Sequence, residues 1–147
     1  AILTYVAELC GKEAVKRVWV TCGEFPIRAS MVYATTGVDV LVGPETGVMN
    51  AAALEPVQKV VFLSHSSQEN LTKHWTNYRV LEAFPACRPC HRLHYGWDRC
   101  VKDEATQTAV CQSMIDPDMA EAAILAALND AIEANKLLAG IRAAAAE

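Results

Sequence analysis

The sequence predicts an α/β fold, with helices on both faces of a Rossmann-like parallel sheet. Short apolar runs, typical of strands covered on both faces, alternate with segments that carry helical spacing or helix-capping signals. Alternating strands and helices form βαβ units, which build parallel sheets. With 147 residues, 52% of them hydrophobic, the chain is long enough for one domain with one core, which we expect to span 1–147.

The first part of the chain is expected to alternate between helix and strand. Residues 2–10 place apolar side chains at helical spacing and predict a helix. Residues 15–22 are rich in β-branched and aromatic residues and predict a strand, followed by a turn at 23–26. Residues 27–36 predict a short helix, and the apolar run 38–42 predicts a buried strand.

The alternation continues through the middle of the chain. Residues 46–54 predict a helix, and the apolar run 57–63 predicts another buried strand. Ser66 and Glu69 have the spacing of a capping box, which predicts a helix over 67–75.

The last third of the chain is expected to be less regular before a long helix. Residues 78–82 predict a short final strand, and 84–112 form an irregular, cysteine-rich insertion. Asp116 and Pro117 then open a helix over 117–142, whose apolar residues recur along one stripe.

Ligands of parallel sheets bind at the carboxyl ends of the strands, which here would be loops 22–26, 43–47 and 64–67. In the second loop Gly47 lets a ligand approach the backbone, and Thr46 can cap the helix or donate to a phosphate oxygen. Glu45 could accept a hydrogen bond from a ribose or sugar hydroxyl, and Asn50 lies one turn further on the face of Thr46. The alternative is an ordinary capped helix after a strand.

The cysteine-rich insertion carries a second candidate site. Cys87 and Cys90 have the spacing of a zinc knuckle, and Cys100 and Cys111 could complete a tetrahedral structural zinc site. His91 and His94 are reserve ligands. Unligated thiols and a partial disulfide remain open, because Cys100 and Cys111 are not a tight pair.

The loop Ser64-His65-Ser66-Ser67 is a third candidate. A serine beside a histidine indicates nucleophilic catalysis only if a third group orients the histidine. The simpler interpretation is a loop whose hydroxyls cap the next helix, with His65 contacting the ligand.

Composition and charge argue against some classes of protein. The net charge is −4, and the Lys and Arg residues are scattered, which argues against a nucleic-acid binder. No apolar run is long enough to span a bilayer, and no signal peptide is visible. We therefore expect a reducing, cytoplasmic location, with peripheral attachment at the inner membrane left open.

Three segments resemble the ADP-heptose:lipopolysaccharide heptosyltransferase family (glycosyltransferase family 9), in the family's order. The first, residues 38–53 with Glu45-Thr46-Gly47, is similar to the family's strand followed by Asp-Thr-Gly-x-x-His. The second is Val60-Val61-Phe62-Leu63-Ser64-His65. The third comprises Cys87-Arg88-Pro89-Cys90-His91, Cys100 and Cys111-Gln112-Ser113-Met114-Ile115 before the final helix. The likeness spans residues from about 15 to 130.

The resemblance implies the C-terminal, nucleotide-sugar-binding half of a GT-B glycosyltransferase. Thr46, Gly47 and Val48 would contact phosphate, and the turn with Glu24 and Pro26 would lie against the adenine. Glu45 stands at the family's Asp position and Asn50 at its His position. These two residues and His65 complete the predicted donor site.

The resemblance also implies the reaction and the partners. A sugar would move from an ADP-sugar to a saccharide or lipopolysaccharide acceptor, with no organic cofactor. The family's general base belongs to a facing acceptor domain, so no catalytic residue is expected here and this chain alone is not expected to be active. That domain, and the first strands of the sheet, would precede Ala1. The alternative function is a non-catalytic zinc module that binds a partner protein.

Overall fold

The computed structural model describes residues 2–21, 23–88, 90 and 100–145. The chain forms two compact units, Ala1–Ser30 and Met31–Glu147, and each is described by itself. Among the described residues, no helix combines the length and apolar character needed to cross a membrane.

The first unit is helical. It contains α1 (Ile2–Cys10), α2 (Lys12–Val15) and the start of α3 (Ile27–Thr36). The predicted strand at 15–22 is wrong, because its described residues form no strand. A strand needs a hydrogen-bonded neighbour, and none lies beside this segment within the described part of the chain. Trp19 instead stays 64% exposed, with its ring edge-on to Phe25 at 5.5 Å.

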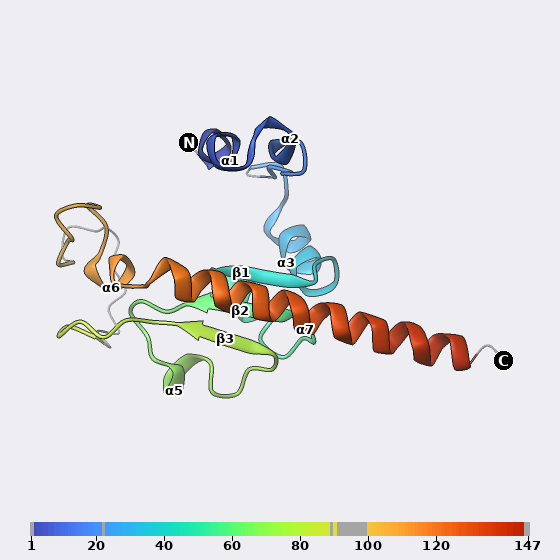
Figure 1. Ribbon diagram of the computed structural model, residues 1–147. Coiled ribbons are helices and arrows are strands. Elements are labelled where there is room, and N and C mark those ends of the chain that lie inside the picture. The colour runs from blue at the N-terminus through green and yellow to red at the C-terminus, as the bar shows by residue number, and fades with distance from the viewer. Residues whose placement is uncertain (1, 22, 89, 91–99, 146–147) are drawn as a thin grey trace. The chain divides into compact units, whose positions relative to one another are not determined.

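The second unit contains a three-stranded parallel sheet, which confirms the α/β class and the other three predicted strands (Figure 1). Strands β1 (Val40–Pro44), β2 (Gln58–Phe62) and β3 (Tyr78–Leu81) follow one another in both sequence and space. Val42 lies opposite Val60, which lies opposite Arg79. All three carboxyl ends therefore meet at one edge of the sheet.

Helices pack on both faces of this sheet. On one face, α4 (Gly47–Ala51) and α5 (Gln68–Leu71) contribute Met49 and Leu71 to a cluster with Val61 and Leu63. On the other face, α7 (Pro117–Ala144) contributes Ala127 to a cluster with Val60 and Leu81. Successive β2 residues thus point to opposite layers, as the pleat of a strand requires. Figure 1 shows α7 lying along the sheet.

The helix boundaries differ in part from expectation. α7 begins as predicted: the Asp116 carboxylate accepts a hydrogen bond from the Asp118 N–H at 2.9 Å. A short helix, α6 (Val110–Ser113), lies within the predicted irregular insertion. The N-cap of α5 is Ser67 rather than Ser66, which is buried, and α5 ends at Leu71. α4 likewise stops short of residue 54.

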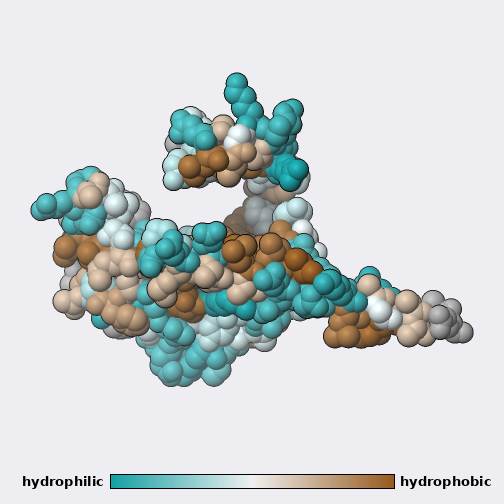
Figure 2. Space-filling view, viewed as in Figure 1, coloured by the Kyte–Doolittle hydropathy of each residue, from teal (hydrophilic) through white to brown (hydrophobic). Residues whose placement is uncertain are grey.

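Apolar side chains remain on the surface of the second unit. Figure 2 shows hydrophobic residues on the C-terminal part of α7, where Leu137, Leu138 and Ile141 are each at least 50% exposed. Such positions lie beyond the part of α7 that packs Ala127 and Ala131 inward.

Lys59 is fully buried on β2. Its Nζ donates to the carbonyl oxygens of Val57 at 2.7 Å and Glu55 at 2.8 Å. Burial lowers the pKa of Lys59 from 10.5 to about 8, against the opposing attraction of the Glu55 charge. This lysine lies at the amino end of the strand, away from the edge where the predicted site residues gather.

Candidate functional site

Glu45 joins the loops that follow β1 and β2. Its Oε1 accepts hydrogen bonds from the backbone N–H groups of Ser64 and of His65, the latter at 2.8 Å. The Ser64 hydroxyl donates to the same oxygen at 2.7 Å. The Glu45 side chain is only 5% exposed, so these bonds form in an environment where they are strong. Two of the three loops that were predicted to follow sheet strands, 43–47 and 64–67, are thus bonded to each other through Glu45.

His65 completes this cluster. Its Nδ1 lies 3.0 Å from Glu45 Oε1, and its side chain is 34% exposed. The second carboxylate oxygen of Glu45 is buried and finds no hydrogen-bond partner in the described part of the structure.

Ser64 is not arranged as a nucleophile. A catalytic serine must donate its hydroxyl to the base that activates it. Here the hydroxyl of Ser64 donates to the Glu45 carboxylate instead. The simpler interpretation of this loop, in which Ser67 caps the next helix, agrees with the hydrogen bond from the Asn70 N–H to the Ser67 hydroxyl.

Arg88, which lies between the predicted zinc ligands Cys87 and Cys90 in the sequence, also binds the loop that follows β2. Its guanidinium donates to the carbonyls of Ser64 at 3.0 Å, Ser66 at 2.9 Å and Ala83 at 2.8 Å. It also forms an ion pair with Glu82 at 2.6 Å, and its side chain is 2% exposed. The backbone on both sides of His65 is thereby fixed by one buried cation.

The other predicted donor-site residues near this cluster differ in their exposure to solvent. Thr46 precedes α4, but its side chain makes no capping hydrogen bond. Thr46, Gly47 and Asn50 are exposed and Val48 is half-buried. Their surfaces are open to a ligand, whereas Glu45 Oε1 is already used by the protein.

Glu24 and Pro26 belong to the first compact unit rather than to the sheet. The loop that holds them does not follow a sheet strand, since residues 16–21 form none. Their predicted contact with adenine stays a prediction.

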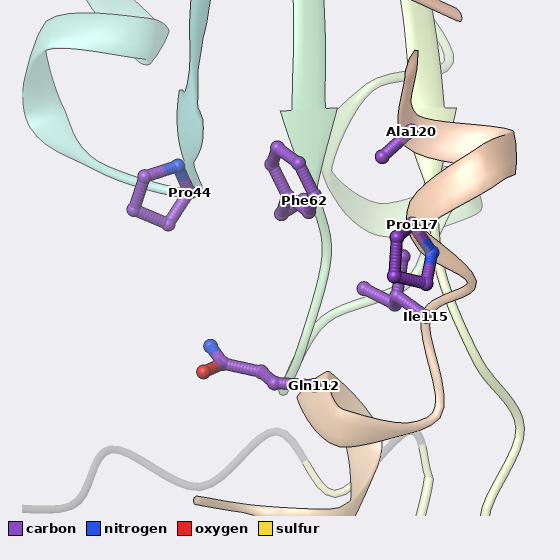
Figure 3. A pocket seen from close by; sticks show the side chains of 6 residues that line it. All are labelled: Pro44, Phe62, Gln112, Ile115, Pro117 and Ala120. Carbon is purple, nitrogen blue, oxygen red and sulfur yellow. The ribbon is translucent and has the colours of Figure 1, made fainter. Parts of the chain in front are cut away.

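An apolar pocket adjoins the edge formed by β1 and β2 (Figure 3). Its volume is about 420 Å³, and α6 and the start of α7 form one side of it. The Gln112 side chain extends into the hollow and is the polar group among apolar walls. The other lining residues are Pro44, Phe62, Ile115, Pro117 and Ala120. Sequence reasoning missed this pocket, because nothing in the spacing of these residues indicates that they meet.

Three of the four predicted zinc ligands, Cys87, Cys90 and Cys100, lie close enough to the fourth, Cys111, to affect its pKa. Burial raises the pKa of the Cys111 thiol, and negative charge on Cys87, Cys100 and Cys90 raises it further. All four are free thiols. Among the residues that the structure describes, no three His, Cys, Asp or Glu side chains are placed to hold a metal ion as they stand. His91 and His94 lie outside the described residues.

No protein-family model matches the chain, and no curated protein or solved structure matches it either. The site itself must therefore carry the functional argument. Arg88 is the member of the site that the sequence did not reveal, because its position inside Cys87-Arg88-Pro89-Cys90 drew attention to the cysteines.

Proposed function

We propose that this chain is the nucleotide-sugar-binding part of a heptosyltransferase-like glycosyltransferase. Its fold would be the Rossmann-like half of a GT-B enzyme, and its donor an ADP-sugar. The observation that carries the proposal is the junction of Glu45 with Ser64 and His65, at the carboxyl edge of a parallel sheet. Ligands of such sheets bind at this edge.

The residues after Glu45 supply the donor contacts in this proposal. Thr46 and Gly47 are exposed at the start of α4, where backbone N–H groups lack partners within the helix. Such groups stabilise the charge that develops on a departing diphosphate. Val48 and Asn50 continue the same surface, while Glu45 keeps the two loops together. Glu24 and Pro26 would contact the adenine.

The remaining steps of the reaction lie outside the donor site. The sugar would pass to a hydroxyl of a saccharide or lipopolysaccharide acceptor bound by a facing domain. A cytoplasmic location, with peripheral attachment at the inner membrane, agrees with such a substrate. Nucleic acid has no role in this proposal.

The test is titration calorimetry of the chain with ADP and with ADP-glucose. A side chain at Gly47 would meet nothing nearer than Met31 Cε at 4.0 Å, so Gly47→Asp adds a negative charge without a clash. We expect Gly47→Asp to weaken ADP binding at least tenfold, about 1.4 kcal/mol. Gly140→Asp is the matched control, because a side chain at Gly140 meets open space on α7.

Two results would contradict the proposal. One is the absence of ADP and ADP-glucose binding by the intact parent protein. The other is binding by Gly47→Asp as tight as that of Gly140→Asp, which would place the diphosphate elsewhere.

A second candidate function is a zinc-stabilised module that binds a partner protein. The observation that favours it is that Cys87, Cys90 and Cys100 lie close enough to Cys111 to raise the pKa of its thiol. Four thiolates can hold one tetrahedral zinc ion and add its binding energy to folding. Elemental analysis should then find one zinc per chain, lost in Cys87→Ser and kept in a Cys10→Ser control, whose thiol is exposed on α1. Zinc-free native protein would rule the site out.

A further inference from the structure

We propose that the apolar pocket beside β1 and β2 binds an uncharged nucleobase, with the Gln112 carboxamide at the edge of the base and the Phe62 ring against its face. The inference goes beyond the proposed function, because it assigns a second ligand to a site that does not hold the sugar donor. It does not depend on the identity of that donor.

The pocket lies on a different face of the sheet from the proposed diphosphate surface. Phe62, Ile115 and Ala120, which line the pocket, pack in the cluster of the α7 face. The helix α4, whose first residues would contact the diphosphate, packs Met49 in the cluster of the opposite face. A ligand in the pocket therefore does not need to displace a diphosphate at the start of α4.

The charges around the pocket favour an uncharged ligand. None of the six described residues that line it is charged. Its volume of about 420 Å³ lies within the roughly 300–1,000 Å³ that is typical of small-molecule sites. The adjoining N-terminus of α7 does not attract a further anion, because the Asp116 carboxylate caps it and Asp118 adds a second carboxylate to its first turn. A phosphate group is therefore disfavoured here.

Gln112 supplies the hydrogen-bonding group of the pocket. Its backbone is fixed, since its N–H donates to the Ala109 carbonyl at 2.8 Å and its carbonyl accepts from the Ile115 N–H at 3.1 Å. Its carboxamide extends into the hollow (Figure 3), where no described residue forms a hydrogen bond with it. A carboxamide presents a donor beside an acceptor, whichever way it is turned. The edges of nucleobases carry the matching donor and acceptor groups.

The shape of the walls favours a flat ring. Three of the lining side chains, those of Pro44, Phe62 and Pro117, are themselves rings (Figure 3). An aromatic side chain stacks on the face of any base, because every base has a π-face. A sugar ring fits these walls poorly, since it carries several hydroxyls that need partners and the lining residues offer one side-chain amide.

The first experiment is an NMR titration of the ¹⁵N-labelled full chain with adenosine and with uridine, in the presence of excess ADP. The side-chain NH₂ signals of Gln112 are identified as those missing from Gln112→Met, and we expect them to shift with either nucleoside. Gln112→Met should weaken adenosine binding about tenfold, through the loss of two neutral hydrogen bonds. Gln107→Met is the matched control, because the Gln107 amide donates to the Glu104 carbonyl at an exposed position.

The second experiment fills the pocket. Ala120→Leu places a larger side chain at its wall and should abolish adenosine binding, whereas Ala122→Leu, at an exposed position of the same helix, should not. Gly47→Asp should leave adenosine binding unchanged, because Gly47 begins α4 on the opposite face. AMP should bind the pocket several times more weakly than adenosine, since its phosphate would lie near the Asp116 and Asp118 carboxylates.

The outcomes separate this proposal from the proposed donor site. The absence of a shift at Gln112, or equal adenosine affinity in the wild type and Gln112→Met, overturns the nucleobase site. Displacement of adenosine from Gln112 by ADP overturns it as a second site, because the pocket then belongs to the donor. Shifts at Gln112 in a chain that binds no ADP support the pocket and contradict the proposed donor.

Discussion

Replacement of Lys59 by methionine tests a charged side chain that is fully buried on β2. The Lys59 side chain is fully buried, and its ammonium group is bonded to two backbone carbonyls. Its pKa falls from 10.5 to about 8 because burial penalises the charged form. At about 1.4 kcal/mol per pKa unit, this shift corresponds to about 3 kcal/mol between the two protonation states.

The sign follows from proton binding. Between about pH 8 and pH 10.5 the unfolded chain keeps the proton on Lys59 while the folded chain releases it. Because the unfolded state binds more protons there, the free energy of unfolding rises with pH in this window. Relative to Lys59→Met, the wild-type chain should gain about 3 kcal/mol from neutral pH to above pH 10.5.

Urea denaturation followed by circular dichroism across this pH range measures the difference. Lys73→Met is the matched control, since Lys73 is 45% exposed on its side chain and pairs with Glu69 at the surface. Subtracting the variant removes the titration of tyrosines and cysteines common to both chains. A wild-type minus Lys59→Met difference that stays level with pH would refute the reasoning.

Three further predictions concern single residues. Arg88→Met should lower the free energy of unfolding by about 3–5 kcal/mol, because it removes the cation that pairs with Glu82 and the donor to three backbone carbonyls. Thermal denaturation should show that Arg88→Lys restores only part of this stability. Full stability in Arg88→Lys would contradict the role of the planar guanidinium group. Asp116→Ala should cost about 1 kcal/mol through loss of the α7 cap, and Asp116→Asn should keep most of it. Cys111, whose thiol pKa is raised, should react with iodoacetamide near pH 8 more slowly than the exposed Cys10. That difference should vanish in urea, and equal rates in the native protein would show that Cys111 is not shielded.

The sheet was predictable because its strands are short apolar runs separated by helix signals. The run at 15–22 carries the same local signal but has no partner strand, so its propensity alone did not produce one. Local patterns cannot report whether a neighbour is available. The same limit explains α5, where Ser67 and not Ser66 accepts the Asn70 N–H. Ser66 is buried, and Arg88 binds its carbonyl.

Several residues of the site were predictable from the sequence, but most of the contacts between them were not. The topology rule placed Glu45 and His65 at the same edge, and the structure joins them. The rule could not foresee that Glu45 would bond the protein rather than a ligand, because that depends on the path of the loop after β2. Nor could it foresee Gln112 beside Phe62, since α6 reaches the edge from a distant part of the sequence.

The order of the elements along the chain has a consequence for synthesis on the ribosome. Val40 pairs with Gln58 and Lys59 with Tyr78, so the sheet can form from one continuous stretch with α4 and α5 already in the connections. The face of the sheet that contains Val60 and Leu81, in contrast, is covered only after Ala127 of α7 has been synthesised. A nascent chain that has emerged only through β3 therefore exposes that apolar face, and this is the stage at which a chaperone would find most to bind.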